Sequence, residues 1–251
     1  MRNKKEWILL LTAIPISLFG LSAMSTFLSG DTYLTKQSIW IVLGIVTYIV
    51  VSKLDINILK NTKVILFIYS VSNLLLLATV FIGNVVKGSK AWISFGGVSL
   101  QPADFAKLAL IILLAKYFSK RHVEIKQLRH IAVSLVYTLI PISLVMLQPD
   151  LGSALVLAGI WFVMVVASGL SKKHLFVMVG LGVVAASLMW VFVFKDYQKN
   201  RILNFVNPER DVRGSGYNVF QAEVAIGSGE IFGKGVGYGT QSRLSFLPEH
   251  E

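Results

Sequence analysis

The chain contains no cysteine, which excludes disulfide bonds, a thiol nucleophile and any metal site built from thiolates. Charge is also scarce, because Asp, Glu, Lys and Arg together make up only 15% of the 251 residues. The histidines lie in expected loops or near the ends of apolar segments, without the spacing of metal ligands: His122, His130, His174 and His250. The sequence therefore offers no histidine- or cysteine-based metal site.

Hydrophobic residues dominate what is present, at 55% of the chain with a mean hydropathy of +0.69. That composition excludes a soluble domain, and runs of about 20 apolar residues are long enough to cross a bilayer as helices. We expect seven spans: 7–28, 38–51, 64–86, 103–118, 131–147, 153–170 and 174–194. The first apolar run is too long for a signal peptide and more spans follow it. The predicted fold is an all-α polytopic transmembrane helix bundle, one domain over residues 1–251, with a long extracytoplasmic loop at 195–251.

Charge is distributed unevenly between the two sets of alternating loops. One set, which includes the N-terminus, carries 13 basic and three acidic residues, whereas the other carries 11 basic and 10 acidic residues. Because basic loops stay on the cytoplasmic side, the N-terminus is predicted to be cytoplasmic and Glu251 extracytoplasmic. The net charge of +11 follows this topology and requires no nucleic acid partner.

The fourth predicted span begins with charged residues. Pro102 suits the first turn of a helix, and Asp104 in that turn suits the positive end of the helix dipole. Lys107 lies three residues further on, within pairing distance of Asp104. Two interpretations stay open: a local ion pair at the membrane boundary, or a functional site in which Lys90 and Lys107 bind a pyrophosphate.

Two further segments have both a structural and a functional interpretation. Asp150 opens the sixth span and is either an ordinary N-cap or a site residue. The loop from residue 201 onward contains an amphipathic run and many glycines, and it either closes the bundle or carries function. The glycines at 227–239 do not fit a phosphate-binding loop, because the spacing and the preceding strand are missing.

Three stretches carry a resemblance to a known family. They read KGSKAWISFGGVSLQPADFAKL, QPDLGSALV and GSGYNVFQAEVAIGSGEIFGKGVGYGTQSRLSFLPE. In this order they resemble the SEDS proteins RodA, FtsW and SpoVE of bacterial cell-wall synthesis, and the last stretch resembles the RodA branch most. The resemblance implies a bacterial cytoplasmic membrane protein with about ten helices, of which this chain holds about seven. It also implies polymerisation of lipid II and partnership with a class B penicillin-binding protein.

The same resemblance implies a set of substrate-binding residues, namely Lys90, Trp92, Gln101, Asp104, Lys107, Asp150 and Glu249. Lys90 replaces the arginine usual in the family, and Asp104 is one methylene shorter than the usual glutamate. Lys90 and Lys107 would stabilise charge on the departing undecaprenyl pyrophosphate. Asp150 and Glu249 could hold a divalent cation, Mg²⁺ or Mn²⁺.

The catalytic residue implied by the resemblance lies outside the sequence. The family motif continues to an aspartate that would be position 253, and this sequence ends at Glu251. Such a carboxylate would act as general base on the acceptor hydroxyl. We therefore expect no catalytic residue within these 251 residues and no lipid II polymerisation by them alone. A lipid II flippase or transporter and a non-catalytic membrane scaffold remain the alternative functions.

Overall fold

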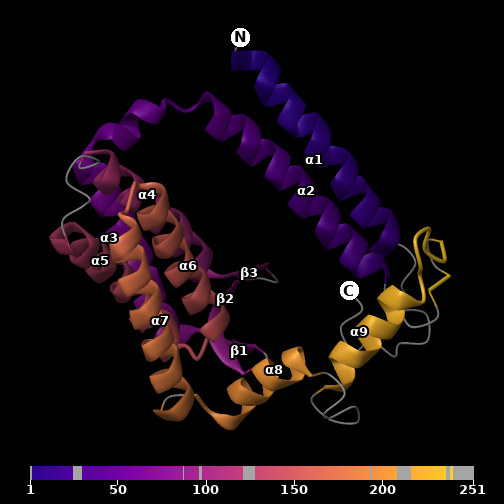
Figure 1. The fold of residues 1–251 in the computed structure, drawn as a ribbon. Coiled ribbons are helices and arrows are strands. Elements are labelled where there is room, and N and C mark those ends of the chain that lie inside the picture. Colours follow the sequence, from indigo (N-terminus) through magenta and orange to yellow (C-terminus); the bar gives the residue numbers. More distant parts are fainter. Residues whose placement is uncertain are drawn as a thin grey trace. The chain divides into compact units, whose positions relative to one another are not determined.

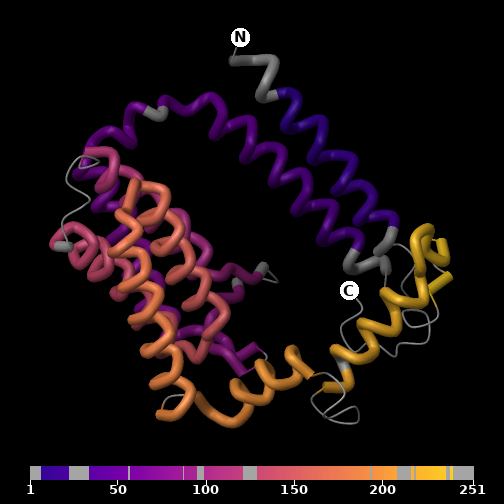
Figure 2. Tube along the Cα trace, viewed as in Figure 1, coloured from indigo at the N-terminus to yellow at the C-terminus, as the bar shows by residue number. Residues whose placement is uncertain are grey.

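The structure is a computed structural model that describes residues 2–24, 30–86, 88–95, 98–120, 128–192, 194–207, 216–235 and 238–239, and Figure 2 follows the chain through them. The chain forms two compact units, one of Asp55–Val184 and one of Met1–Leu54 together with Ala185–Glu251. The sequence-based assignment of one domain to the whole chain stays a prediction.

The unit Asp55–Val184 is a helix bundle with a small sheet (Figure 1). Its elements in chain order are the 3₁₀ helix η1 (Ile56–Lys60), α3 (Thr62–Ile82), β1 (Asn84–Val86), β2 (Ser89–Phe95), β3 (Val98–Leu100), α4 (Pro102–Ser119), α5 (Leu128–Leu147), α6 (Leu151–Ala167) and the first part of α7 (Lys172–Phe192). Helices α3, α4, α5 and α6 pack against one another around a shared core.

That core is apolar, with a few polar side chains that join neighbouring helices. Its fully buried members include Leu76, Leu110, Leu114, Val145 and Leu157. Side-chain hydrogen bonds cross between helices, and two of them lie beside this core. The hydroxyl of Tyr69 donates to the carbonyl oxygen of Tyr137 at 2.6 Å, and the indole N–H of Trp161 donates to the hydroxyl of Ser134 at 2.9 Å. Such bonds are an ordinary means of helix association in membranes, where burial of apolar surface gives little driving force.

The other unit holds α1 (Arg2–Met24), α2 (Gly30–Lys53), α8 (Asp196–Val206) and α9 (Tyr217–Gly227). Helices α1 and α2 contact each other. Helices α8 and α9 lie within the predicted loop 195–251. Helix α9 coincides with the amphipathic run seen in the sequence, whereas α8 was not anticipated.

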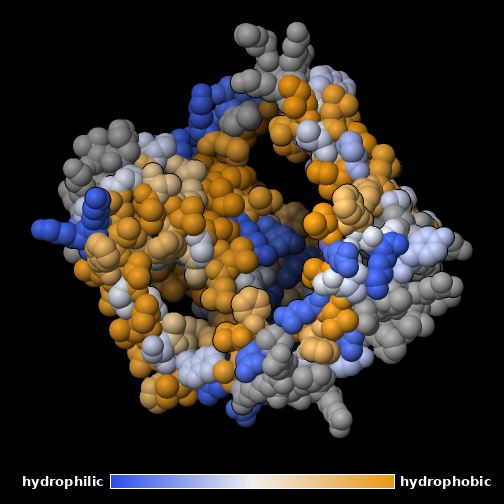
Figure 3. All heavy atoms as spheres, turned by 45° about the vertical axis from the view of Figure 1, so that its right-hand side comes forward, coloured by the Kyte–Doolittle hydropathy of each residue, from blue (hydrophilic) through white to orange (hydrophobic). Residues whose placement is uncertain are grey.

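The helices expose their apolar side chains on the outside of the packing. Four of them, within the described part of the chain, are long and apolar enough to cross a membrane: Leu34–Lys53, Thr62–Ile82, Arg129–Leu147 and Lys172–Phe192. Two shorter apolar helices cover Trp7–Ser22 and Leu151–Ala167. Figure 3 shows the resulting surface, on which hydrophobic residues (orange) cover most of the visible helices. A hydrocarbon environment suits this surface, whereas water would not.

The region between the third and fourth helices differs from the prediction. The third span was expected to continue to Val86 and a loop to follow, but α3 ends at Ile82 and residues 84–100 contain a three-stranded antiparallel sheet of order β1-β2-β3. In its register Asn84 lies opposite Trp92, and Ile93 lies opposite Leu100. β-Branched and aromatic residues favour strands, and hydropathy alone cannot distinguish a strand that follows a helix from more helix.

Gly83 stands where α3 turns into the sheet, and we expect its replacement by alanine to be destabilising. A Cβ atom at this position would collide with the carbonyl oxygen of Thr79 and lie 2.9 Å from the carbonyl oxygen of Lys90. Both obstacles are backbone, so they cannot move aside without displacing α3 or β2. The expected loss is about 1–3 kcal/mol, as for other overpacked sites, measured by denaturant unfolding in detergent.

Gly159→Ala is the matched control for this substitution. Gly159 lies inside α6, and a Cβ atom there meets nothing within 4 Å. Alanine is the better helix former by about 1 kcal/mol, so this variant should be as stable as the parent chain or more stable. Equal stability of the two variants would show that the end of α3 does not contact β2 as described.

Candidate functional site

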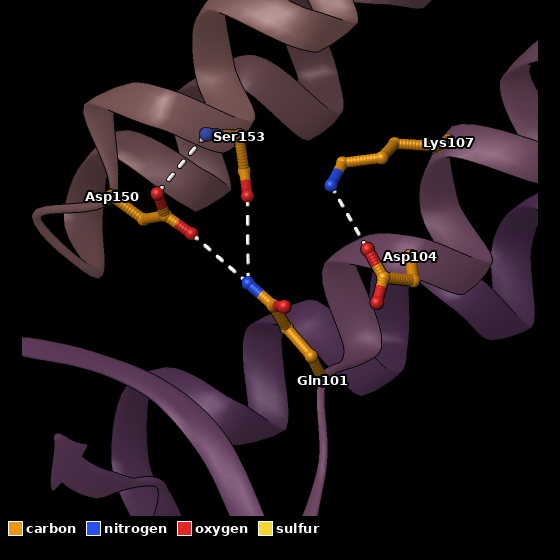
Figure 4. Close-up of polar contacts among 5 residues, drawn as sticks. All are labelled: Gln101, Asp104, Lys107, Asp150 and Ser153. Atoms are coloured by element: carbon orange, nitrogen blue, oxygen red, sulfur yellow. Dashed lines mark hydrogen bonds and ion pairs between the residues drawn. The ribbon is translucent and has the colours of Figure 1, made fainter. Parts of the chain in front are cut away.

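The first polar cluster joins the beginnings of α4 and α6 (Figure 4). Gln101 is the N-cap residue of α4, and Asp150 is the N-cap residue of α6, where its carboxylate accepts a hydrogen bond from the backbone N–H of Ser153. The side-chain amide of Gln101 donates to the other carboxylate oxygen of Asp150 at 3.2 Å and lies 3.5 Å from the hydroxyl of Ser153. Two helix N-termini are therefore held side by side by their own capping residues.

The second polar feature is an ion pair in the first turns of α4. The ammonium of Lys107 lies 2.9 Å from a carboxylate oxygen of Asp104, as the spacing predicted. The Asp104 side chain is 61% exposed and the Lys107 side chain only 22% exposed. A pair with one partner this exposed contributes little to stability. Lys107 is therefore a cation at the start of α4 whose protein partner is weakly bound.

The strand residues of the predicted site lie on β2. Trp92 is half-buried there, opposite Asn84 of β1. The ammonium of Lys90 donates at 2.9 Å to the carbonyl oxygen of Phe81, in the last turn of α3. This is the end of a helix at which cations are favoured. Lys90 and Lys107 thus have different hydrogen-bonding partners in the structure.

Gln148 was not predicted as a site residue, although it connects the strand to the turn before α6. Its side chain is 1% exposed, and its amide donates to the carbonyl oxygen of Leu76 on α3 at 2.9 Å. Its own backbone carbonyl accepts from the N–H of Lys90 at 3.1 Å and from the hydroxyl of Ser89 at 3.0 Å. The available signal was a polar residue at the end of an apolar span, directly before the Pro-Asp turn.

The described residues do not provide the ligands of a divalent cation. No group of three or more His, Asp or Glu side chains gathers within the described segments. Asp150 already accepts hydrogen bonds from Ser153 and Gln101. Glu249, its predicted companion, lies outside the described residues. The cation stays a prediction.

The arrangement is suited to binding an anion beside hydroxyl groups. The N-terminus of α4 presents the positive end of a helix dipole without a side-chain cap, whereas the N-terminus of α6 is capped by the carboxylate of Asp150. Lys107 adds a formal positive charge in the first turns of α4, and the carboxylates of Asp104 and Asp150 can accept hydrogen bonds from hydroxyl groups. These groups come from two of the sequence stretches that carry the family resemblance.

Comparison with known proteins gives consistent matches over most of the chain. The family profile of cell cycle proteins that covers FtsW, RodA and SpoVE matches residues 6–251. The peptidoglycan glycosyltransferase MrdB of Escherichia coli K12 is 34% identical over 209 residues, which are 83% of this chain and 56% of the relative. The chain therefore spans a little more than half the length of that protein.

Solved structures give the same result for the fold. A chain of a peptidoglycan synthase complex that coordinates polymerization and crosslinking superposes with a TM-score of 0.75 at 29% identity, covering 96% of this chain and 74% of that one. The rod shape determining protein RodA of Thermus thermophilus superposes with a TM-score of 0.62 at 31% identity. The superposition covers 72% of this chain and 58% of the RodA chain. These similarities confirm the predicted all-α polytopic membrane helix bundle.

The two carboxylates at the site should differ in their importance for folding. Asp150→Ala removes the N-cap of α6 and the hydrogen-bond acceptor of Gln101, and should cost about 1–2 kcal/mol of stability. Asp104→Ala removes only the exposed partner of an ion pair and should change stability by less than about 0.5 kcal/mol. Denaturant unfolding in detergent measures both, and equal losses would refute the distinction.

Proposed function

This chain belongs to the cell cycle protein family of FtsW, RodA and SpoVE, and we propose that it forms the lipid II-binding part of a peptidoglycan glycosyltransferase. The observation that carries the proposal is the bond between Gln101 and Asp150 where α4 and α6 begin, together with the pair of Lys107 and Asp104 in the first turns of α4 (Figure 4). A polar cluster at the end of an otherwise apolar bundle suits a ligand with an apolar tail and a charged headgroup.

The headgroup of lipid II is a pyrophosphate that carries sugars, and each part has a matching group here. Lys107 is a compact cation of the kind that binds phosphate, and its low exposure reduces screening by solvent. The N-terminus of α4, which no side chain caps, adds partial positive charge in the same part of the helix. Together they would stabilise the negative charge that develops on the undecaprenyl pyrophosphate as the acceptor sugar displaces it.

The capping cluster would orient the sugars without taking part in bond formation. Gln101 and Asp150 hold each other through one hydrogen bond, so their remaining polar atoms are fixed in direction. Trp92 on β2 is half-buried and precedes Gln101 by nine residues, so its aromatic side chain is a further candidate for sugar contact. The general base is a carboxylate that we place in the family motif after Glu249, outside the residues described.

The distribution of charge supports a location for the site on the outer face of the bacterial cytoplasmic membrane. The beginnings of α4 and α6 belong to loops of the same side under the alternation of spans, and that side is the less basic one. Lipid II is polymerised outside the cytoplasm, so this orientation agrees with the proposed activity.

A class B penicillin-binding protein is the proposed partner, and cell elongation the proposed role. The support is the structural similarity to a chain of a synthase complex in which polymerization is coordinated with crosslinking, and to a rod shape determining protein. The alternative function, transport of the same lipid, would require polar groups along the spans toward the cytoplasmic side, in addition to the cluster where α4 and α6 begin.

Lys107→Ala should weaken the binding of fluorescent lipid II by about tenfold or more, because a charge-assisted hydrogen bond is worth about 1.5–3 kcal/mol. Binding is measured on the purified chain in nanodiscs, with undecaprenyl pyrophosphate as competitor. In a full-length relative, the equivalent substitution should abolish polymerisation while expression stays near normal.

Lys116→Ala is the matched control, since Lys116 lies in the last turn of the same helix. It should bind lipid II as the parent chain does, and Lys107→Arg should keep most of the affinity. Equal binding by Lys107→Ala and the parent chain would contradict the proposal. Loss of folded protein in step with loss of binding would instead assign Lys107 to a structural ion pair.

The proposed orientation is tested by reporter fusions along the chain. A reporter joined after Leu170, between α6 and α7, should report the cytoplasm. A reporter joined after Lys199, within α8, should report the exterior. The physical reason is the excess of basic residues in the loops on the side of the N-terminus. The opposite pattern of the two reporters would reject the orientation.

A further inference from the structure

We infer that Gln148 is a positioning residue, which fixes strand β2 and the start of α6 relative to each other and to α3. The inference rests on the proposed function only for its consequence, the affinity for lipid II. The structural part of the inference is that the segment with Lys90 and the segment with Asp150 keep a fixed separation. This part depends only on the hydrogen bonds of Gln148.

Three elements meet at this one residue. The backbone carbonyl of Gln148 accepts from two groups of β2, the N–H of Lys90 at 3.1 Å and the hydroxyl of Ser89 at 3.0 Å. The side-chain amide donates to the carbonyl oxygen of Leu76 in the middle of α3, at 2.9 Å. Gln148 itself is two residues before Asp150, which caps α6. A shift of any one element would break a hydrogen bond of this residue.

The hydrogen bond from the Gln148 side chain to Leu76 adds little net stability to the fold. A role in positioning the elements can therefore be distinguished from a role in stabilising the protein. The amide oxygen is buried and has no donor among the described residues. The gain from the bond to Leu76 is therefore offset by an acceptor that lost its water. The carbonyl of Leu76 lies inside α3, where helical geometry already provides a donor. An apolar side chain of similar length should thus fold about as well and hold the elements less firmly.

The consequence for the site is specific. Because Gln148 links to β2 by its backbone and to α3 by its side chain, the turn that leads into Asp150 cannot rotate independently. Asp150 in turn holds the amide of Gln101 at the start of α4. Greater freedom at Gln148 would therefore reach the bond between Asp150 and Gln101, although the described hydrogen bonds of Gln148 involve neither Gln101, Lys107 nor the Asp150 side chain.

The test measures a distance and an affinity on the same variants. The chain has no cysteine of its own, so spin labels can be attached at Ser94→Cys on β2 and Leu155→Cys on α6, two exposed positions. Pulsed electron resonance then gives the distribution of distances between them in nanodiscs. Gln148→Met is the test variant, and the binding of fluorescent lipid II is measured on each protein without the labels.

Thr138→Val is the matched control. Thr138 lies on α5, the helix that ends one residue before Gln148; it is fully buried and donates to the carbonyl oxygen of Ser134 in the same helix. Its replacement removes a hydrogen bond that lies within α5 and involves neither β2, α3 nor the turn before α6. Ser89→Ala is a second test variant, which removes one of the two bonds from β2 and keeps Gln148 in place.

We expect Gln148→Met to broaden the distance distribution, to weaken lipid II binding by about tenfold, and to leave the unfolding midpoint close to that of Thr138→Val. Ser89→Ala should broaden the distribution to a smaller extent, and Thr138→Val should leave distances and binding unchanged. If Gln148→Met folds poorly, the comparison of distances and binding is made between Ser89→Ala and Thr138→Val.

Unchanged distances in both Gln148→Met and Ser89→Ala would overturn the inference. So would weaker binding that follows the loss of folded protein equally in the test and control variants. If the parent chain itself fails to bind lipid II, the proposed function fails. The distance measurement then still decides whether Gln148 fixes β2 relative to α6.

Discussion

The hydrogen bond between the amide of Gln101 and the carboxylate of Asp150 is the interaction on which the candidate site depends. Both residues cap helices that are otherwise apolar, and the first N–H groups of a helix have no partner within it. At the boundary of a hydrocarbon region those groups need a partner in the protein, because the cost of leaving them bare is several kcal/mol. Asp150 meets that need for α6, since its carboxylate accepts from the N–H of Ser153. The side chain of Gln101 makes no such bond to α4 and donates to Asp150 instead. The residue that completes α6 therefore also anchors the start of α4.

The helices could be predicted from the sequence because the apolar runs are long, and a hydrophobic run of that length has few alternatives. The strands could not, because β1 and β3 have three residues each, and β1 begins two residues after the end of the apolar helix α3. Val85 and Val86 raise the hydropathy of the third run just as helical residues would. What ends the helix is Gly83, whose lack of a side chain allows Lys90 to approach. That approach is a contact between residues of different elements and leaves no trace in a hydropathy profile.

The contacts of the candidate site also fall into those that the sequence predicts and those that it does not. The cap formed by Asp150 and the pair of Asp104 with Lys107 are local, so the spacing of residues three apart predicts them. The bond from Gln101 to Asp150 joins residues 49 positions apart, and that from Gln148 to Leu76 joins residues 72 positions apart. Nothing in the sequence pattern specifies which polar side chains meet across such distances. The sequence therefore predicts candidate residues, and the packing of α3, α4 and α6 decides their partners.

The unequal exposure of Lys107 and Asp104 bears on how a ligand would enter the site. Lys107 is the less exposed partner at 22%, whereas Asp104 is 61% exposed. A pyrophosphate that took the place of Asp104 would bring more charge to Lys107 than a carboxylate does. Asp104 would then return to water, which costs little because most of its surface already faces water. The exchange leaves no buried charge without a partner, and it needs no movement of the capping cluster. Under the proposed function, the ion pair would keep Lys107 oriented at the start of α4 until an anion of higher charge replaced Asp104.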